Sequence, residues 1–156
     1  MFQSQKDTII TLLKARDAAR NYGKANYWFS YKDFLDPADI FTEFCCENLD
    51  GKQNYISLIE KMLDADKTAK IFVEVYGLEE DGNAQFIYAD TLFIFSKLSL
   101  EMITLIFNEL IDIFPSDIGE ETDFSRQNYL IDENGNLVSV KNLFDSGYSV
   151  YYCWWD

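Results

Sequence analysis

The strongest constraint on the fold lies between residues 70 and 95, where two alternating segments flank a turn signal. In 70–76, KIFVEVY, every second residue after Lys is Ile or Val, which gives a strand one apolar row. Asp81-Gly82 is a typical hairpin turn pair. A second strand is predicted over about 85–95, with a bulge near Ala89-Asp90 because the strand is long for one unbroken run. These residues predict an antiparallel hairpin.

Three helices are predicted before this hairpin. Residues 6–22 carry apolar side chains at helical spacing, and Gly23 ends the pattern. Asp36-Pro37 combines a capping Asp with Pro at the first helical position, so a second helix is predicted to run to about Asn48. The same spacing predicts a third helix over about Gln53–Asp64.

The remaining segments predict a connection, one helix and further strands. The aromatic-rich segment 24–35 is interpreted as a connection between the first two helices. Ser99 is expected to cap a helix that Pro115 closes, and an acidic loop follows over 116–123. A hairpin is predicted around Asn134-Gly135, and a last strand starts at about Tyr148.

The predicted fold class is α+β, with three N-terminal helices and then a mostly antiparallel sheet of about five strands with one inserted helix. A single domain is expected over residues 1–156, since single domains cluster near about 100–150 residues.

The charge of the chain is concentrated in its second half. Residues 1–70 carry ten Lys or Arg and eleven Asp or Glu, whereas residues 71–156 carry three and sixteen. Such a negative field repels phosphate groups and anionic membrane surfaces, so neither a nucleic acid nor a membrane is expected as a partner. It attracts a basic macromolecule. The alternative is an acidic surface that serves solubility alone.

Catalytic and metal-binding patterns are largely missing. The sequence has no histidine, three cysteines and no glycine-rich phosphate loop. The segment from Asp132 resembles a calcium loop, but its sixth and twelfth positions are Leu137 and Leu143 instead of Gly and Glu. We therefore expect no enzyme activity, no catalytic residue, no cofactor and no metal. Chance carboxylate pairs among 27 acids leave a metal-assisted hydrolase as an alternative.

The chain ends in the aromatic segment YYCWWD, residues 151–156. In a strand, Tyr152 and Trp154 share one face, and Tyr151 and Trp155 share the other. One interpretation is a central strand that is covered on both faces. The other leaves Tyr151 and Trp155 at the surface as aromatic anchors, because Tyr and Trp are enriched at binding hot spots.

An acidic, histidine-free α+β chain with an aromatic end resembles the small immunity proteins of contact-dependent growth inhibition and other polymorphic toxin systems. At motif level the resemblance involves YLIDENGNLVSV (129–140) and SVYYCWWD (149–156). The resemblance implies a cytoplasmic protein that binds a cognate toxin domain, often a basic nuclease, and blocks its active site. It implies no catalytic residues. The absence of a signal-peptide pattern and of any apolar stretch near 20 residues agrees with a cytoplasmic location.

The function predicted from the sequence is therefore a non-enzymatic inhibitor that neutralises a basic toxin domain through an acidic surface with aromatic anchors. A generic adaptor for a basic protein is a second hypothesis, and the sequence does not identify the toxin or the oligomeric state. The predicted partner-binding residues are Glu79, Glu80, Asp81, Asp117, Glu120, Glu121, Asp123, Tyr151, Trp155 and Asp156.

Overall fold

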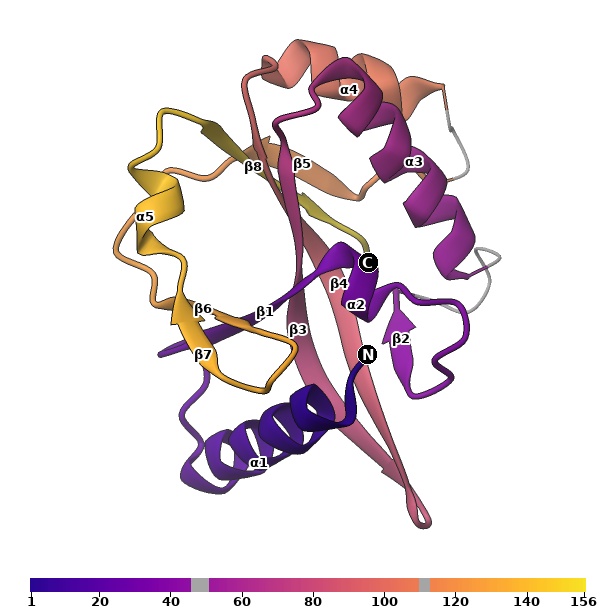
Figure 1. Cartoon of the computed structure of the whole chain (residues 1–156), viewed down its shortest axis with the longest axis vertical. Coiled ribbons are helices and arrows are strands. Elements are labelled where there is room, and N and C mark those ends of the chain that lie inside the picture. The colour runs from indigo at the N-terminus through magenta and orange to yellow at the C-terminus, as the bar shows by residue number, and fades with distance from the viewer. Residues whose placement is uncertain (46–50, 110–112) are drawn as a thin grey trace.

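A computed structural model describes residues 1–45, 51–109 and 113–156 of the chain (Figure 1). Helices and strands are interleaved along this part of the sequence. None of the helices in it is both long and apolar enough to cross a bilayer. The helices are α1 (Gln3–Ala19), α2 (Tyr31–Phe34), α3 (Lys52–Ala65), α4 (Leu100–Asn108) and α5 (Lys141–Phe144). The strands are β1 (Asn26–Ser30), β2 (Thr42–Phe44), β3 (Lys70–Asp81), β4 (Ala84–Ser96), β5 (Asp117–Glu120), β6 (Asn128–Ile131), β7 (Leu137–Ser139) and β8 (Ser149–Trp154).

The described strands form one mixed sheet of eight strands in the order β5-β8-β4-β3-β1-β6-β7, and β2 pairs with β4 outside this path. The pairs β1–β6 and β2–β4 are parallel, and the other pairs are antiparallel. Strand β4 pairs with β2 through residues 87–89 and with β8 through residues 91–96. The chain end is therefore an internal strand between β4 and β5.

Each face of the sheet carries its own apolar cluster. The larger cluster joins one face to α1, α2, α3 and α4, for example through Leu13, Ile59 and Phe107. The smaller cluster lies on the other face around Trp28, whose ring stacks on Phe93 at a centroid distance of 4.7 Å. Helix α5 covers part of this second face. Successive side chains of a strand point to opposite faces of the sheet, so the same strands contribute to two separate apolar cores.

The predicted hairpin over residues 70–95 is confirmed by β3 and β4. Strands β3 and β4 are joined at Asp81-Gly82, and Gly82 has a φ of 61°, which suits glycine. The pairing passes from Glu74–Thr91 to Val75–Ala89. Asp90 is therefore the additional residue of a β-bulge, at the position that the sequence predicted.

The predicted fold class is wrong in its arrangement of helices and strands. Only α1 precedes the first strand, where three helices were predicted, and the sheet is mixed and larger than five strands. The segment 24–35, predicted as a connection, contains β1 and α2. Its Trp28 and Phe29 are fully buried on opposite faces of the sheet. Adjacent aromatic residues are typical of an internal strand whose two faces are both covered.

The helix predicted from Asp36-Pro37 is replaced by a loop and by β2 over the described residues, and residues 46–48 of that prediction lie outside them. Asp36 and Asp39 each accept a backbone hydrogen bond from the residue two positions ahead, which forms turns instead of a helix. Lys52 donates to the main-chain oxygens of both residues. Ile40, which the helix would have buried, is 71% exposed. Contacts from the distant Lys52 override the local helix signal.

Asp66 connects the end of α3 to the end of β4. Its carboxylate accepts from the N–H and the hydroxyl of Thr68 at 3.0 and 2.7 Å. It also accepts from the Ser96 hydroxyl and the Lys97 N–H, both at 2.8 Å. Burial raises the pKa of Asp66, but these donors outweigh it and hold the pKa well below the usual range.

We expect Asp66→Ala to lower the free energy of unfolding by about 1–2 kcal/mol at neutral pH, because four hydrogen bonds to one carboxylate are lost. The pKa is lower in the folded state, so the carboxylate stabilises the fold above the unfolded pKa of about 3.9 and loses this effect as the pH falls through the folded value. Urea unfolding at pH 7 and near pH 3 measures the difference between variant and wild type. A difference that grows on acidification would contradict this role.

Candidate protein-binding surface

The more accessible aromatic row of β8 is formed by the partly buried Tyr152 and the exposed Trp154, on the face opposite to the predicted anchors. Trp154 is 38% exposed, whereas Tyr151 and Trp155 are 4% and 3% exposed. The Tyr151 hydroxyl donates to the Leu98 main-chain oxygen at 2.8 Å. The Trp155 Nε1 donates to the Ile113 main-chain oxygen, also at 2.8 Å. The predicted anchors therefore belong to the core and are not accessible to a partner on this fold.

Trp154 lies beside the bulge of β4. Its Nε1 donates to Asp90 Oδ2 at 3.2 Å, and the Asp90 main-chain oxygen accepts from the Trp155 N–H at 3.0 Å. The second carboxylate oxygen of Asp90 accepts from the Thr91 hydroxyl at 2.8 Å. The bulge turns Asp90 toward the end of β8. The Asp90 carboxylate therefore holds the N–H edge of the Trp154 indole in place.

Tyr152 makes the corresponding contact with the edge strand β5. Its hydroxyl donates to Asp117 Oδ2 at 3.2 Å. The ring lies across Gly119, where an added Cβ would come within 2.7 Å of the Tyr152 hydroxyl oxygen. Gly119 therefore leaves the space that the ring fills. Burial and the negative charge of Asp117 raise the pKa of Tyr152.

We call these four residues, Asp90, Asp117, Tyr152 and Trp154, the acidic-aromatic strip. The strip crosses β4, β8 and β5 on one face of the sheet, with aromatic rings in the middle and a carboxylate on either side. Among the residues that the structure describes, neither Asp90 nor Asp117 forms an ion pair with Lys or Arg. Carboxylates with free lone pairs next to an indole face suit an incoming guanidinium or ammonium group.

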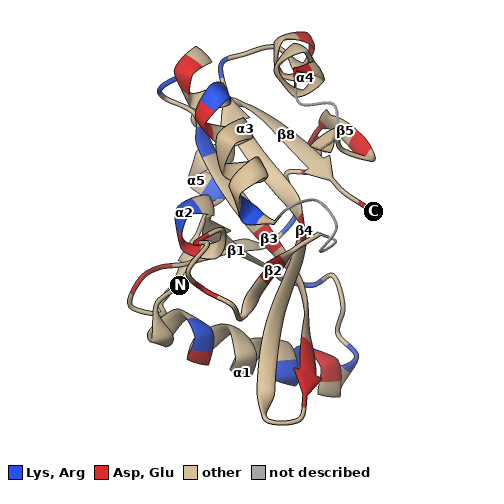
Figure 2. Ribbon diagram, turned by 90° about the vertical axis from the view of Figure 1, so that its right-hand side faces the viewer, with Lys and Arg blue, Asp and Glu red and all other residues tan. Residues whose placement is uncertain are grey.

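The predicted acidic residues lie in two separate regions (Figure 2). Glu79, Glu80 and Asp81 lie at the tip of the β3–β4 hairpin, at one end of the long axis of the molecule and away from β5. Glu80 forms an ion pair with Lys14 at 3.1 Å. The hairpin acids therefore do not form one surface with the acids of β5.

The acids around β5 differ in accessibility and role. Asp117 and Glu120 are exposed, and the Asp156 N–H donates to the Ser116 hydroxyl, which places the chain end beside β5. Glu121 instead forms an ion pair with Arg126 at 3.1 Å, and its side chain is largely buried. The Asp123 carboxylate accepts two hydrogen bonds from Ser125, which lower the pKa of Asp123. Glu121 and Asp123 thus stabilise their own loop.

Asp90, Tyr152 and Trp154 are not among the partner-binding residues predicted from the sequence. Alternation had placed Tyr152 and Trp154 in one row, and the other row contains Cys153. Cysteine is among the residues most often buried, so Cys153 was a signal that its row, with Tyr151 and Trp155, faces the core. Cys153 is fully buried, and this burial raises the pKa of its thiol well above the usual value.

Comparisons of the chain with protein-family models, with curated proteins and with solved structures found no match. Within residues 1–45, 51–109 and 113–156, no group of three or more His, Cys, Asp or Glu side chains is arranged to hold a metal ion. Among the described residues, the acidic-aromatic strip is the feature that best fits a binding function.

Proposed function

We propose that this chain is a non-enzymatic inhibitor that binds a basic protein, specifically a cognate toxin domain, with the acidic-aromatic strip at the centre of the interface. The observation that carries the proposal is the exposed Trp154 indole, which is hydrogen-bonded to Asp90 and lies on a strand paired on both sides in the sheet. Tryptophan at the surface costs solubility, and it is among the residues that contribute most to binding when a partner buries it.

The strip combines two properties that a cationic partner requires. The net charge of −14 accelerates the encounter with a basic protein, and exposed acids such as Glu120 and Asp156 extend the negative field around the strip. Slow dissociation needs a desolvated centre, because exposed ion pairs contribute only about 0–1 kcal/mol each. Trp154 and Tyr152 supply apolar area for that centre, with few rotamers to restrict.

The partner is identified with a matched pair of baits. The wild-type chain and Trp154→Ala are immobilised and incubated with lysate from the source organism, and proteins retained by the wild type but lost from the variant are identified. We expect this set to contain a basic protein, and we expect added salt to release it from the wild-type bait. If both baits retain the same proteins equally, the strip is not part of the interface.

Charge reversal at the strip should slow capture of that partner. We expect Asp117→Lys combined with Glu120→Lys to lower the association rate constant about 10-fold at low ionic strength, and less at high salt. The matched control is Glu79→Lys combined with Asp81→Lys, which changes the net charge equally at the remote hairpin tip. Stopped-flow association measures both. Equal effects of the two double variants would mean that only global charge matters.

A protection assay separates an inhibitor from an adaptor. Co-expression of the chain with the captured protein should rescue growth if that protein is toxic, and Trp154→Ala should reduce the rescue. A captured protein that is harmless when expressed alone would favour the adaptor hypothesis.

A further inference from the structure

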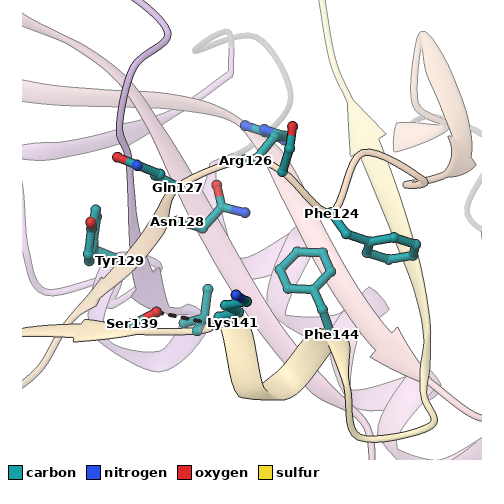
Figure 3. A pocket seen from close by; sticks show the side chains of 10 residues that line it. Phe124, Arg126, Gln127, Asn128, Tyr129, Ser139, Lys141 and Phe144 are labelled. Atoms are coloured by element: carbon teal, nitrogen blue, oxygen red, sulfur yellow. Dashed lines mark hydrogen bonds between the residues drawn. The ribbon is translucent and has the colours of Figure 1, made fainter.

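A second site lies on the same face of the sheet, between β6, β7 and α5. Its cavity has a volume of about 320 Å³, at the small end of the range of about 300–1,000 Å³ that is typical of small-molecule pockets. Aromatic side chains from two segments meet there, because the rings of Phe124 and Phe144 are 5.6 Å apart and nearly perpendicular. Arg126 and Lys141 also line the cavity (Figure 3).

The feature that marks this cavity is the side chain of Asn128. Asn128 is 3% exposed, and neither its Oδ1 nor its Nδ2 has a hydrogen-bond partner among the described residues. Figure 3 shows its amide directed into the space between Arg126 and Phe144. Each unsatisfied buried polar atom costs on the order of 1–3 kcal/mol, so an amide with both atoms unpaired destabilises the free protein.

The Arg126 guanidinium beside this amide is already committed to other partners. The Arg126 guanidinium donates to Glu74 at 2.7 and 2.9 Å and to Glu121 at 3.1 Å, and it lies 5.0 Å from the centre of the Phe93 ring. The main-chain oxygen of Asn128 accepts from the Val140 N–H at 3.2 Å, so its backbone is used in the β6–β7 connection. The side-chain amide of Asn128 is therefore available to bind a ligand in the cavity.

We propose that this cavity binds an uncharged planar group that carries an adjacent hydrogen-bond donor and acceptor, namely a primary carboxamide or the lactam edge of a nucleobase. Asn128 offers the complementary acceptor and donor in one plane, and such a pair forms two hydrogen bonds at once. Phe124 and Phe144 provide apolar contacts for the ring or the aliphatic part of the ligand. This site goes beyond the proposed inhibitor function and does not depend on it.

Because Asn128 is almost fully buried, a ligand reaches its amide only when a side chain at the rim of the cavity moves. Phe124 is 60% exposed, and Lys141 is exposed with no ion pair in the part of the chain that the structure describes. Either can rotate toward solvent without breaking an ion pair, whereas Arg126 is held by two carboxylates. Of the two cations that line the cavity, Arg126 is paired with Glu74 and Glu121, and the net charge of −14 disfavours a phosphorylated ligand, which supports an uncharged one.

The first test measures thermal stability. Asn128→Leu is expected to raise the midpoint temperature of the free protein by about 3–8 °C, because it removes two unsatisfied atoms from a buried position. Asn26→Leu is the matched control, since Asn26 pairs with Asn128 in the β1–β6 register and is only half-buried. A lower midpoint for Asn128→Leu than for the control would show that the amide already has partners, and it would overturn the proposal.

The second test measures binding with defined probes by ¹⁵N NMR titration of the full chain. Benzamide is expected to shift the Asn128 side-chain signals, and acetophenone, which keeps the ring and the acceptor but lacks the donor, should bind about 10-fold more weakly. Asn128→Leu should abolish the difference between the two probes. Uracil and N-acetylglutamine amide then distinguish a nucleobase from a peptide side chain as the source of the group. Equal binding of benzamide and acetophenone to the wild type, or no binding of either, overturns the proposal.

Discussion

Replacing Trp155 with alanine is expected to lower the free energy of unfolding by about 3–5 kcal/mol, the largest stability effect that we predict for a single residue. The indole makes perpendicular contacts with Phe44 and Tyr55, at centroid distances of 5.6 and 5.2 Å. It also lies 6.0 Å from the Phe107 ring on α4. Truncation would leave a cavity among β2, α3 and α4 and leave the Ile113 main-chain oxygen without its donor.

The neighbouring Trp154 provides a matched control with the same chemical change. We expect Trp154→Ala to lower the free energy of unfolding by less than about 1 kcal/mol, because its ring is half-exposed and its hydrogen bond to Asp90 lies at the surface. Urea unfolding of both variants measures this contrast. Similar losses for the two variants would contradict the division of the tail into one core row and one exposed row.

Replacing Arg126 with methionine should lower the free energy of unfolding by about 3 kcal/mol at pH 7. Arg126 is the cationic partner of Glu74 and Glu121, whose side chains are 19% and 14% exposed, and removing it leaves both carboxylates without this cation. Glu74 also accepts a hydrogen bond from the buried Trp28 Nε1 at 2.7 Å, so it stays fixed beside the smaller core. Methionine preserves much of the apolar stem of Arg126 over Phe93.

This loss should depend on pH in a defined direction. Burial raises the pKa of Glu74 above its usual value even though Arg126 opposes the rise, and without Arg126 the pKa rises further. A carboxyl group with a higher pKa in the folded state favours folding when it is protonated, so its stabilising effect is complete below the unfolded pKa of about 4.3 and is lost as the pH rises through the folded value. The difference between Arg126→Met and wild type should therefore shrink between pH 7 and pH 5.

A second substitution identifies the group responsible. Glu74→Gln keeps an acceptor for Trp28 without the charge, so the Glu74→Gln, Arg126→Met double variant should recover part of the loss and show a weaker dependence on pH. The loss of unfolding free energy that remains in the double variant measures the effect of removing Arg126 from Glu121. A pH-independent loss in the single variant would mean that packing of the arginine stem, and not the charge of Glu74, dominates.

Local signals in the sequence were sufficient for several elements of the fold. The β3–β4 hairpin, its turn at Asp81-Gly82 and its bulge at Asp90 depend on residues close together in the chain. The same holds for the start of α4, where the Ser99 hydroxyl accepts from the Met102 N–H at 3.2 Å. The Asn134-Gly135 turn likewise joins β6 to β7. Each of these features depends on a few neighbouring residues, and the tertiary contacts of the fold are compatible with that local structure.

Other elements were decided by contacts between distant residues. The Asp36-Pro37 start signal failed because Lys52 binds the loop that follows it. Strand β1 was missed because its role depends on β3 on one side and β6 on the other, which no local pattern reveals. The cavity beside Asn128 likewise requires β6 and the loop before it to meet α5.

By itself, the sequence determined that the chain ends in a strand with two aromatic rows and that acidic residues dominate its second half. Cys153 favoured one of the two rows, but the tertiary structure decided which row is buried, because α3 and α4 cover the face that carries Tyr151 and Trp155 and leave Trp154 accessible. Alternation within a strand specifies which residues share a face. Which of the two faces is buried depends on which helices pack against the sheet. That packing is determined by the apolar area buried over the whole core.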